Sequence, residues 1–113
     1  MGLAASQARL LSLTARKSDL ELQGQMINQA RMALANVTGA LFSVSSNLDP
    51  SSPQAQQLQE RIAGIQALDK TLELQLNRVD TQHDAVQTEM DAVKKVIGKN
   101  IGDTFKAFTD IST

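Results

Sequence analysis

Apolar residues recur with a period of seven along this chain of 113 residues, in two stretches separated by a segment rich in proline and serine. In the second stretch the apolar positions lie alternately three and four residues apart over six heptads. This spacing brings them to one stripe of an α-helix and is typical of helices that pack in a left-handed coiled coil. Two sets of positions form the stripe: Leu58, Ile65, Leu72, Val79, Val86 and Val93, and Ile62, Asp69, Leu76, His83, Met90 and Ile97.

The first stretch carries one equally regular line of apolar residues. The line consists of Leu13, Leu20, Ile27, Leu34, Leu41 and Leu48, each seven residues after the one before. A coiled-coil helix needs a second apolar line beside the first. We expect Ala30, Val37 and Val44 to supply it, each three residues after a member of the first line. This stretch therefore also predicts a long helix.

Between the two stretches, the segment 46–53 reads as a turn because it holds both prolines of the chain, Pro50 and Pro53. A residue that precedes proline avoids the helical conformation, so Asp49 and Ser52 are expected to be non-helical. Ser51 or Ser52 can cap the next helix, with Pro53 in its first turn. Two long helices joined by so short a turn must lie antiparallel.

The sequence thus predicts an all-α fold, a long antiparallel two-helix hairpin of coiled-coil type with a short C-terminal helical tail. We expect a single helical domain over 1–113, with helices at about 3–45 and 54–97. The tail, 98–113, follows a break in the heptads at Gly98 and Gly102 and places Ile101, Phe105 and Phe108 on one face. The two glycines could form a hinge, or a pair at spacing four that lets another helix approach closely. Alternatively, the tail folds back on the hairpin.

Composition leaves little material for site chemistry. The chain has no cysteine, which excludes disulfides and thiolate zinc sites. It has one histidine, which excludes a metal site made of several histidines. Asp69 and His83 lie two heptads apart, about 21 Å along one helix, which is too far for a catalytic pair. Polar residues in a coiled-coil stripe more commonly fix register or partner number. We expect no catalytic, cofactor-binding or metal-binding residue, no cofactor, and no enzymatic activity.

Charge and hydropathy exclude two further classes of partner. A net charge of −1, with both signs spread along the chain, argues against a nucleic-acid-binding surface. No apolar run is long enough to span a membrane.

At the N-terminus, Met1 to Ser6 fit the pattern for acylation of Gly2. Residues 1–18 have basic residues but no acid, which is typical of an organellar presequence. A helix start explains this segment as well, and so does an export signal that is not cleaved.

The first helix has more apolar surface than one neighbour can cover. Arg31 is the only charged residue between Gln23 and Val44, and small residues are frequent there. A helix that is apolar over more than one stripe is normally buried by several partners, so we expect an oligomer. The residues expected to carry the helix contacts are Leu13, Leu20, Ile27, Leu34, Leu41, Leu58, Ile65, Leu72, Val79, Val86, Val93, Phe105 and Phe108.

The order of elements resembles the needle subunits of bacterial type III secretion systems: a helix, a turn with Pro50, Ser51 and Pro53, a second helix, and an ending that runs from Thr104 to Ile111. More loosely, the opening Gly2 to Leu11 is similar to the terminal helices of flagellin-like axial proteins. The resemblance implies export without cleavage, a secretion chaperone as a further partner, and helical polymerisation.

We therefore expect a self-assembling structural subunit of an exported bacterial filament or needle-like tube, secreted or held at the cell surface. The alternative is a coiled-coil binding module in a closed oligomer: a secretion chaperone, an adaptor or a small helical effector. That alternative is also compatible with a cytoplasmic protein.

Overall fold

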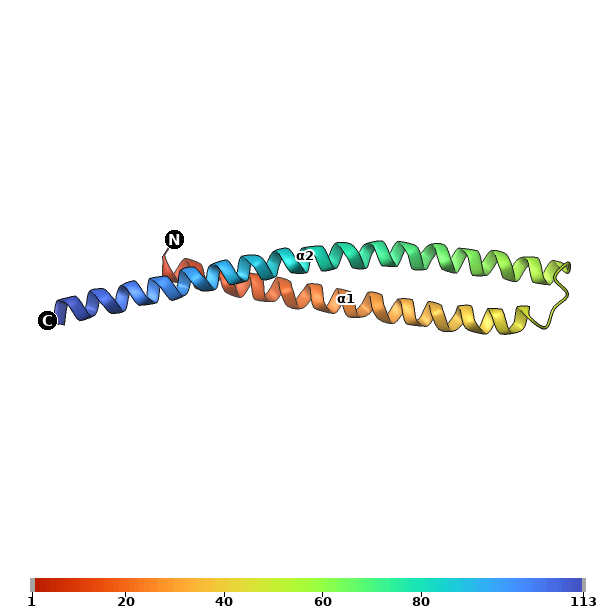
Figure 1. Ribbon diagram of the computed structural model, residues 1–113, viewed down its shortest axis with the longest axis horizontal. Helices are drawn as coiled ribbons and strands as arrows, with labels where there is room; N and C mark the ends of the chain where they lie inside the picture. The colour runs from red at the N-terminus through yellow and green to blue at the C-terminus, as the bar shows by residue number, and fades with distance from the viewer. Residues whose placement is uncertain (1, 113) are drawn as a thin grey trace. The chain divides into compact units, whose positions relative to one another are not determined.

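The computed structural model describes residues 2–112 and consists of two α-helices joined by one turn. Helix α1 runs over Leu3–Ser45 and helix α2 over Pro53–Ser112, and the two run in opposite directions (Figure 1). No strand occurs among the described residues. The prediction of an all-α, antiparallel helical hairpin is confirmed. Met1 of the acylation pattern and Thr113 of the C-terminal tail lie outside the described residues.

Contacts divide the chain into two compact units, where the sequence led us to expect one domain. One unit is Gln23–Val79, which contains the turn and the helical arms on either side of it. We call it the turn unit. The other joins Met1–Leu22 to Asp80–Thr113, so that the start of α1 packs with the later part of α2. We call it the terminal unit.

The turn is held by hydrogen bonds from serine side chains and from the backbone. The Asp49 carboxylate accepts bonds from the Ser51 amide at 3.0 Å and the Ser51 hydroxyl at 2.9 Å. Ser52 Oγ accepts a bond from the Ala55 amide at 3.2 Å, which makes Ser52 the N-cap of α2 with Pro53 at the first helical position. The expected turn, with its cap and its two prolines, is thus observed.

The buried side of α2 follows the heptads read from the sequence. Ile62 and Val79 in the turn unit are buried, and so are Val86 and Met90 in the terminal unit. The remaining predicted positions of α2 are half-buried: Leu58, Ile65, Asp69, Leu72, Leu76, His83, Val93 and Ile97. On α1 the predicted line is also inward, with Leu13 and Leu20 buried and Ile27, Leu34 and Leu41 half-buried.

The second inward line of α1 is not the one expected. Val37 and Val44 are 48% and 51% exposed, and Ala30 is exposed as well. The half-buried positions instead lie four residues after the first line, at Arg31, Thr38 and Ser45. A line of apolar residues at spacing seven can be completed on either side, and here α1 turns its more polar side toward α2.

The expected end of the second helix near residue 97 is also wrong. Helix α2 continues through Gly98 and Gly102 as far as Ser112, and neither glycine has a positive φ. Glycine costs only about 1 kcal/mol relative to alanine inside a helix, which a long helix tolerates. Residues 101–111 are exposed along their whole length, so they do not fold back on the hairpin. The helix has no break at the two glycines that would form a hinge, and a Cβ added at either would meet nothing within 4 Å, so they make no close contact.

Candidate interaction surfaces

In the turn unit, the inner seam of α1 combines an apolar line with a polar one. The inner seam consists of the half-buried residues Gly24, Ile27, Arg31, Leu34, Thr38, Leu41 and Ser45. At Gly24 the helices approach so closely that an added Cβ would lie 3.9 Å from Leu76 Cδ1 and 3.9 Å from Val79 Cγ1. This is ordinary van der Waals contact.

Asp69, the polar residue that interrupts the α2 stripe, has a partner on α1. Arg31 donates from Nε to Asp69 Oδ1 at 2.9 Å and from Nη2 to Oδ2 at 3.2 Å. These bonds hold the pKa of Asp69 below its ordinary value and raise that of Arg31. Arg31 was missed as a partner because the expected stripe of α1 ran through Ala30. Its spacing of four from Ile27 was the available signal.

In the terminal unit, His83 also pairs across the seam. Its Nε2 lies 3.1 Å from Glu21 Oε1, and Glu21 in turn lies 3.9 Å from Lys17 Nζ. Asp80, Asp84 and Gln87 lie within two turns of His83 on α2 and do not share this contact. Gln87 instead donates to Asp91 at 3.1 Å. Within residues 2–112, no three His, Cys, Asp or Glu side chains converge as a metal site would require.

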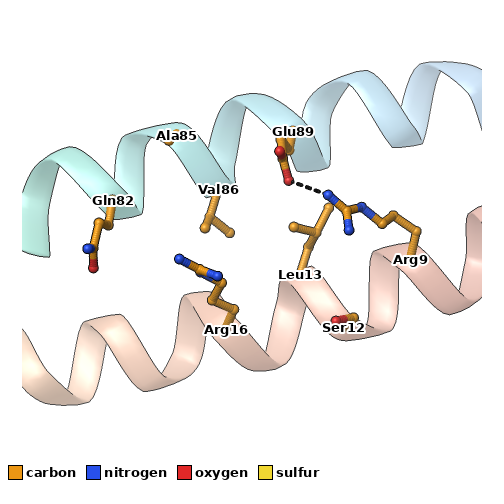
Figure 2. Close-up of a pocket in the computed structure, with 8 residues that line it drawn as sticks. All are labelled: Arg9, Ser12, Leu13, Arg16, Gln82, Ala85, Val86 and Glu89. Atoms are coloured by element: carbon orange, nitrogen blue, oxygen red, sulfur yellow. Dashed lines mark hydrogen bonds and ion pairs between the residues drawn. The ribbon is translucent and has the colours of Figure 1, made fainter.

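A shallow hollow lies between the two helix segments of the terminal unit (Figure 2). Leu13 and Val86 point into the space between the segments, while Arg9 and Glu89 close one end with an ion pair of 2.9 Å. Both side chains of that pair are more than half exposed, so it contributes little to stability. The other residues that line the hollow are Ser12, Arg16, Gln82 and Ala85.

One polar group in the terminal unit is buried without a partner. Ser6 is fully buried, and its hydroxyl oxygen makes no hydrogen bond in the structure. Ser6 lies seven residues before Leu13 and so takes the place of an apolar residue in the inward line of α1. In the sequence, Ser6 was interpreted as part of an acylation pattern, and its place in the heptads was not predicted.

The last turns of α2 present an apolar face that nothing in the described chain covers. Phe105 and Phe108 are 71% and 69% exposed and, with Leu3, Ile101 and Thr104, line a shallow apolar groove. Ile111 is exposed beyond them. We call Ile101, Phe105, Phe108 and Ile111 the C-terminal apolar face. The charged residues of this segment lie on the opposite side of the helix: Lys99, Asp103, Lys106 and Asp110.

The outward side of α1 in the turn unit is the second uncovered apolar surface. Its exposed large side chains are Met26, Met32, Val37, Phe42 and Val44. Arg31 is the one charged residue of α1 in this unit, and it points to Asp69 across the inner seam. This surface is therefore free of charge, unlike the outer face of α2, where Glu60, Arg61 and Lys70 are exposed.

Neither α1 nor α2, over the residues described, has a stretch long and apolar enough to cross a membrane. Comparisons with protein-family models, curated proteins and solved structures found no match to this chain.

Proposed function

We propose that this protein is a structural subunit that assembles with copies of itself through apolar helix faces, and that it has no enzymatic role. One observation carries the proposal. Among the described residues, fifteen large apolar side chains are exposed, whereas only seven apolar residues are buried. Such a surface is costly in water and is characteristic of a chain that is covered by partners in its working state.

The distribution of that surface favours a polymer. Each unit carries an uncovered apolar face of its own: the outward side of α1 in the turn unit and the C-terminal apolar face in the terminal unit. A single self-complementary interface closes into a dimer, whereas two different interfaces propagate. A chain with two such faces is suited to a filament or needle-like tube.

Export of the subunit is the second part of the proposal. The resemblance to type III needle subunits and flagellin-like axial proteins supports a bacterial, secreted or surface-exposed filament. The segment at the start of α1 would serve as an export signal that is not cleaved. A secretion chaperone would cover the apolar faces until the subunit leaves the cell.

The runner-up is a coiled-coil binding module in a closed oligomer, either exported or cytoplasmic. The charged outer face of α2 in the turn unit favours it, because Glu60, Arg61 and Lys70 are well solvated where they are and limit how many sides can be covered. A chaperone, adaptor or small effector of this kind needs one apolar interface rather than two.

Electron microscopy over a concentration series separates the two functions. A filament subunit gives polymers whose length increases with concentration. A closed oligomer gives particles of one size and one mass by light scattering, whatever the loading. Detection by absorbance must use the peptide bond, because the chain has no Trp or Tyr. A protein that stays monomeric at every concentration contradicts both functions.

A further inference from the structure

The outward side of α1 in the turn unit contains a complete second heptad seam. Six consecutive positions, spaced alternately four and three residues apart, are all apolar and all exposed. We call them the outer seam: Met26, Ala30, Ala33, Val37, Ala40 and Val44. The spacing is that of a left-handed coiled coil, as in the inner seam that faces α2. At 100° per residue, the centres of the two seams are about 100° apart around the helix.

The outer seam is the more apolar of the two. The inner seam includes Gly24, Arg31, Thr38 and Ser45, whereas the outer seam has no polar residue. The outer seam lies directly beside the line of Ile27, Leu34 and Leu41, which belongs to the inner seam, so a helix docked on the outer seam would extend the existing core. α1 therefore has the pattern of a helix that packs between two neighbours.

A second copy of α1 fits the outer seam by register. When two copies run antiparallel about a twofold axis at the level of Ala35, Met26 lies opposite Val44 of the other copy. Ala30 then lies opposite Ala40, and Ala33 opposite Val37. The outer seam has two rows of residues at spacing seven, and each layer pairs a residue of one row with a residue of the other row on the second copy, as in antiparallel coiled coils. The contact is thus self-complementary, which an isologous interface requires.

Charge points to the same occupant. Gln29, Asn36 and Ser43 border the outer seam and are uncharged, so a twofold axis brings no like charges together. The outer face of α2 presents Glu60, Arg61, Lys70 and Arg78, which would lose hydration against an apolar seam. Within the turn unit, only another α1 offers a seam that is apolar and uncharged.

We propose that residues 26–44 of α1 form an antiparallel, twofold-symmetric coiled-coil contact with the same residues of a second copy of the chain. The proposal rests on the proposed self-assembly and names the surface and register of one of its interfaces. The four inward lines of the two hairpins would then share one core, as in a four-helix arrangement of two copies.

Engineered cysteines test the register, because the natural chain has none. Met26→Cys and Val44→Cys are made as two separate full-length proteins. Residues 26 and 44 lie about 27 Å apart along the helix, so neither protein should form a disulfide with itself in the antiparallel contact. Mixed under mild oxidation, they should form a linked heterodimer at least tenfold in excess of either homodimer.

The control variant is Gln25→Cys, which is exposed and lies on another side of α1. Mixed with Val44→Cys, it should give no linked species above background. Homodimers of Met26→Cys and of Val44→Cys would indicate a parallel pair and overturn the proposal. If no linked heterodimer forms, light scattering on the same samples shows whether the protein has assembled through another surface or has stayed monomeric. An assembled protein without the heterodimer has its interface elsewhere, which overturns this contact and leaves self-assembly standing, whereas a monomer at every concentration overturns both.

A second variant removes the contact without touching the inner seam. Val37→Lys places a charge in the central layer, and Gln25→Lys places the same charge outside the seam. Because Val37 is half exposed in the isolated chain, helicity by circular dichroism should be unchanged in both variants. The dissociation constant of the dimer should rise at least tenfold for Val37→Lys alone. Equal dissociation constants for the two variants would contradict the assignment.

Discussion

Arg31 binds both carboxylate oxygens of Asp69, at 2.9 and 3.2 Å, and so ties the two helical arms of the turn unit together at one register. A bidentate pair of this kind adds geometric specificity, because a shift of one helix by a turn would separate the two groups. It also explains why α1 turns a charged residue toward α2 and leaves valine outside.

Acidification should remove the stabilising effect of the pair between Arg31 and Asp69. The bonds from Arg31 lower the pKa of Asp69, so the native state binds a proton less tightly than the unfolded state. The pair therefore stabilises the fold fully above the ordinary pKa of aspartate, about 4, and loses this effect as the pH falls through the lowered value. The melting temperature of the natural protein should fall more between about pH 6 and about pH 2 than that of Asp69→Asn.

A control isolates the pair from other acidic groups. The bonds from Ser51 also lower the pKa of Asp49, and this contribution is present in both proteins. In an Arg31→Gln background, Asp69→Asn should no longer alter the acid sensitivity. The same loss of melting temperature on acidification in the natural protein and in Asp69→Asn would show that the pair does not act in solution.

Gly24 should be replaceable with a gain in stability. Alanine is better than glycine inside a helix by about 1 kcal/mol, and the new methyl would touch Leu76 and Val79 at 3.9 Å without a clash. Gly39→Ala is the control, because its Cβ meets nothing within 4 Å. Urea unfolding should show a gain for both and the larger gain for Gly24→Ala. A loss at Gly24 alone would mean that the arms pack more closely there than the structure has them.

Ser6→Ala should also stabilise the protein. The Ser6 hydroxyl is buried without a hydrogen-bond partner, a state that costs about 1–3 kcal/mol. The matched change is Ser12→Ala, at an exposed position of the same helix, where only the helix propensity of alanine acts. Thermal unfolding should rank Ser6→Ala above Ser12→Ala, and the reverse order would argue that the Ser6 hydroxyl has a partner.

The inward and outward sides of α2 should respond differently to the same charge. Val79 is 8% exposed and Leu74 is 55% exposed. Val79→Asp forces a carboxylate against apolar neighbours and should destabilise the protein by about 3 kcal/mol, with loss of helicity by circular dichroism. Leu74→Asp should leave helicity near that of the natural chain. Equal helicity in the two variants would contradict the heptad assignment.

The sequence was sufficient for the fold and for the stripe of α2, because ten of the twelve positions in the two sets that form this stripe are apolar. On α1 it was not sufficient, since Ile27, Leu34 and Leu41 can be completed by Ala30, Val37 and Val44 on one side or by Arg31, Thr38 and Ser45 on the other. Apolar periodicity favours the first set. The choice depends on Asp69, which lies on the opposite helix and binds Arg31.

The end of α2 shows a second limit of reading the sequence. Gly98 and Gly102 look like a break, yet the cost of two glycines is small and the surrounding residues are compatible with a helix. The continuous helix holds Phe105 and Phe108 out in solvent. This exposure could not be predicted from the sequence, because it depends on α2 continuing past Gly102.

Self-association through these exposed apolar faces underlies the proposed function. Sedimentation velocity of the full chain over a wide concentration series measures it, with detection by interference. The average mass should increase with concentration above the 12.2 kDa of one chain, and the increase should be smaller for Val37→Lys. A single species of 12.2 kDa at every concentration would contradict it.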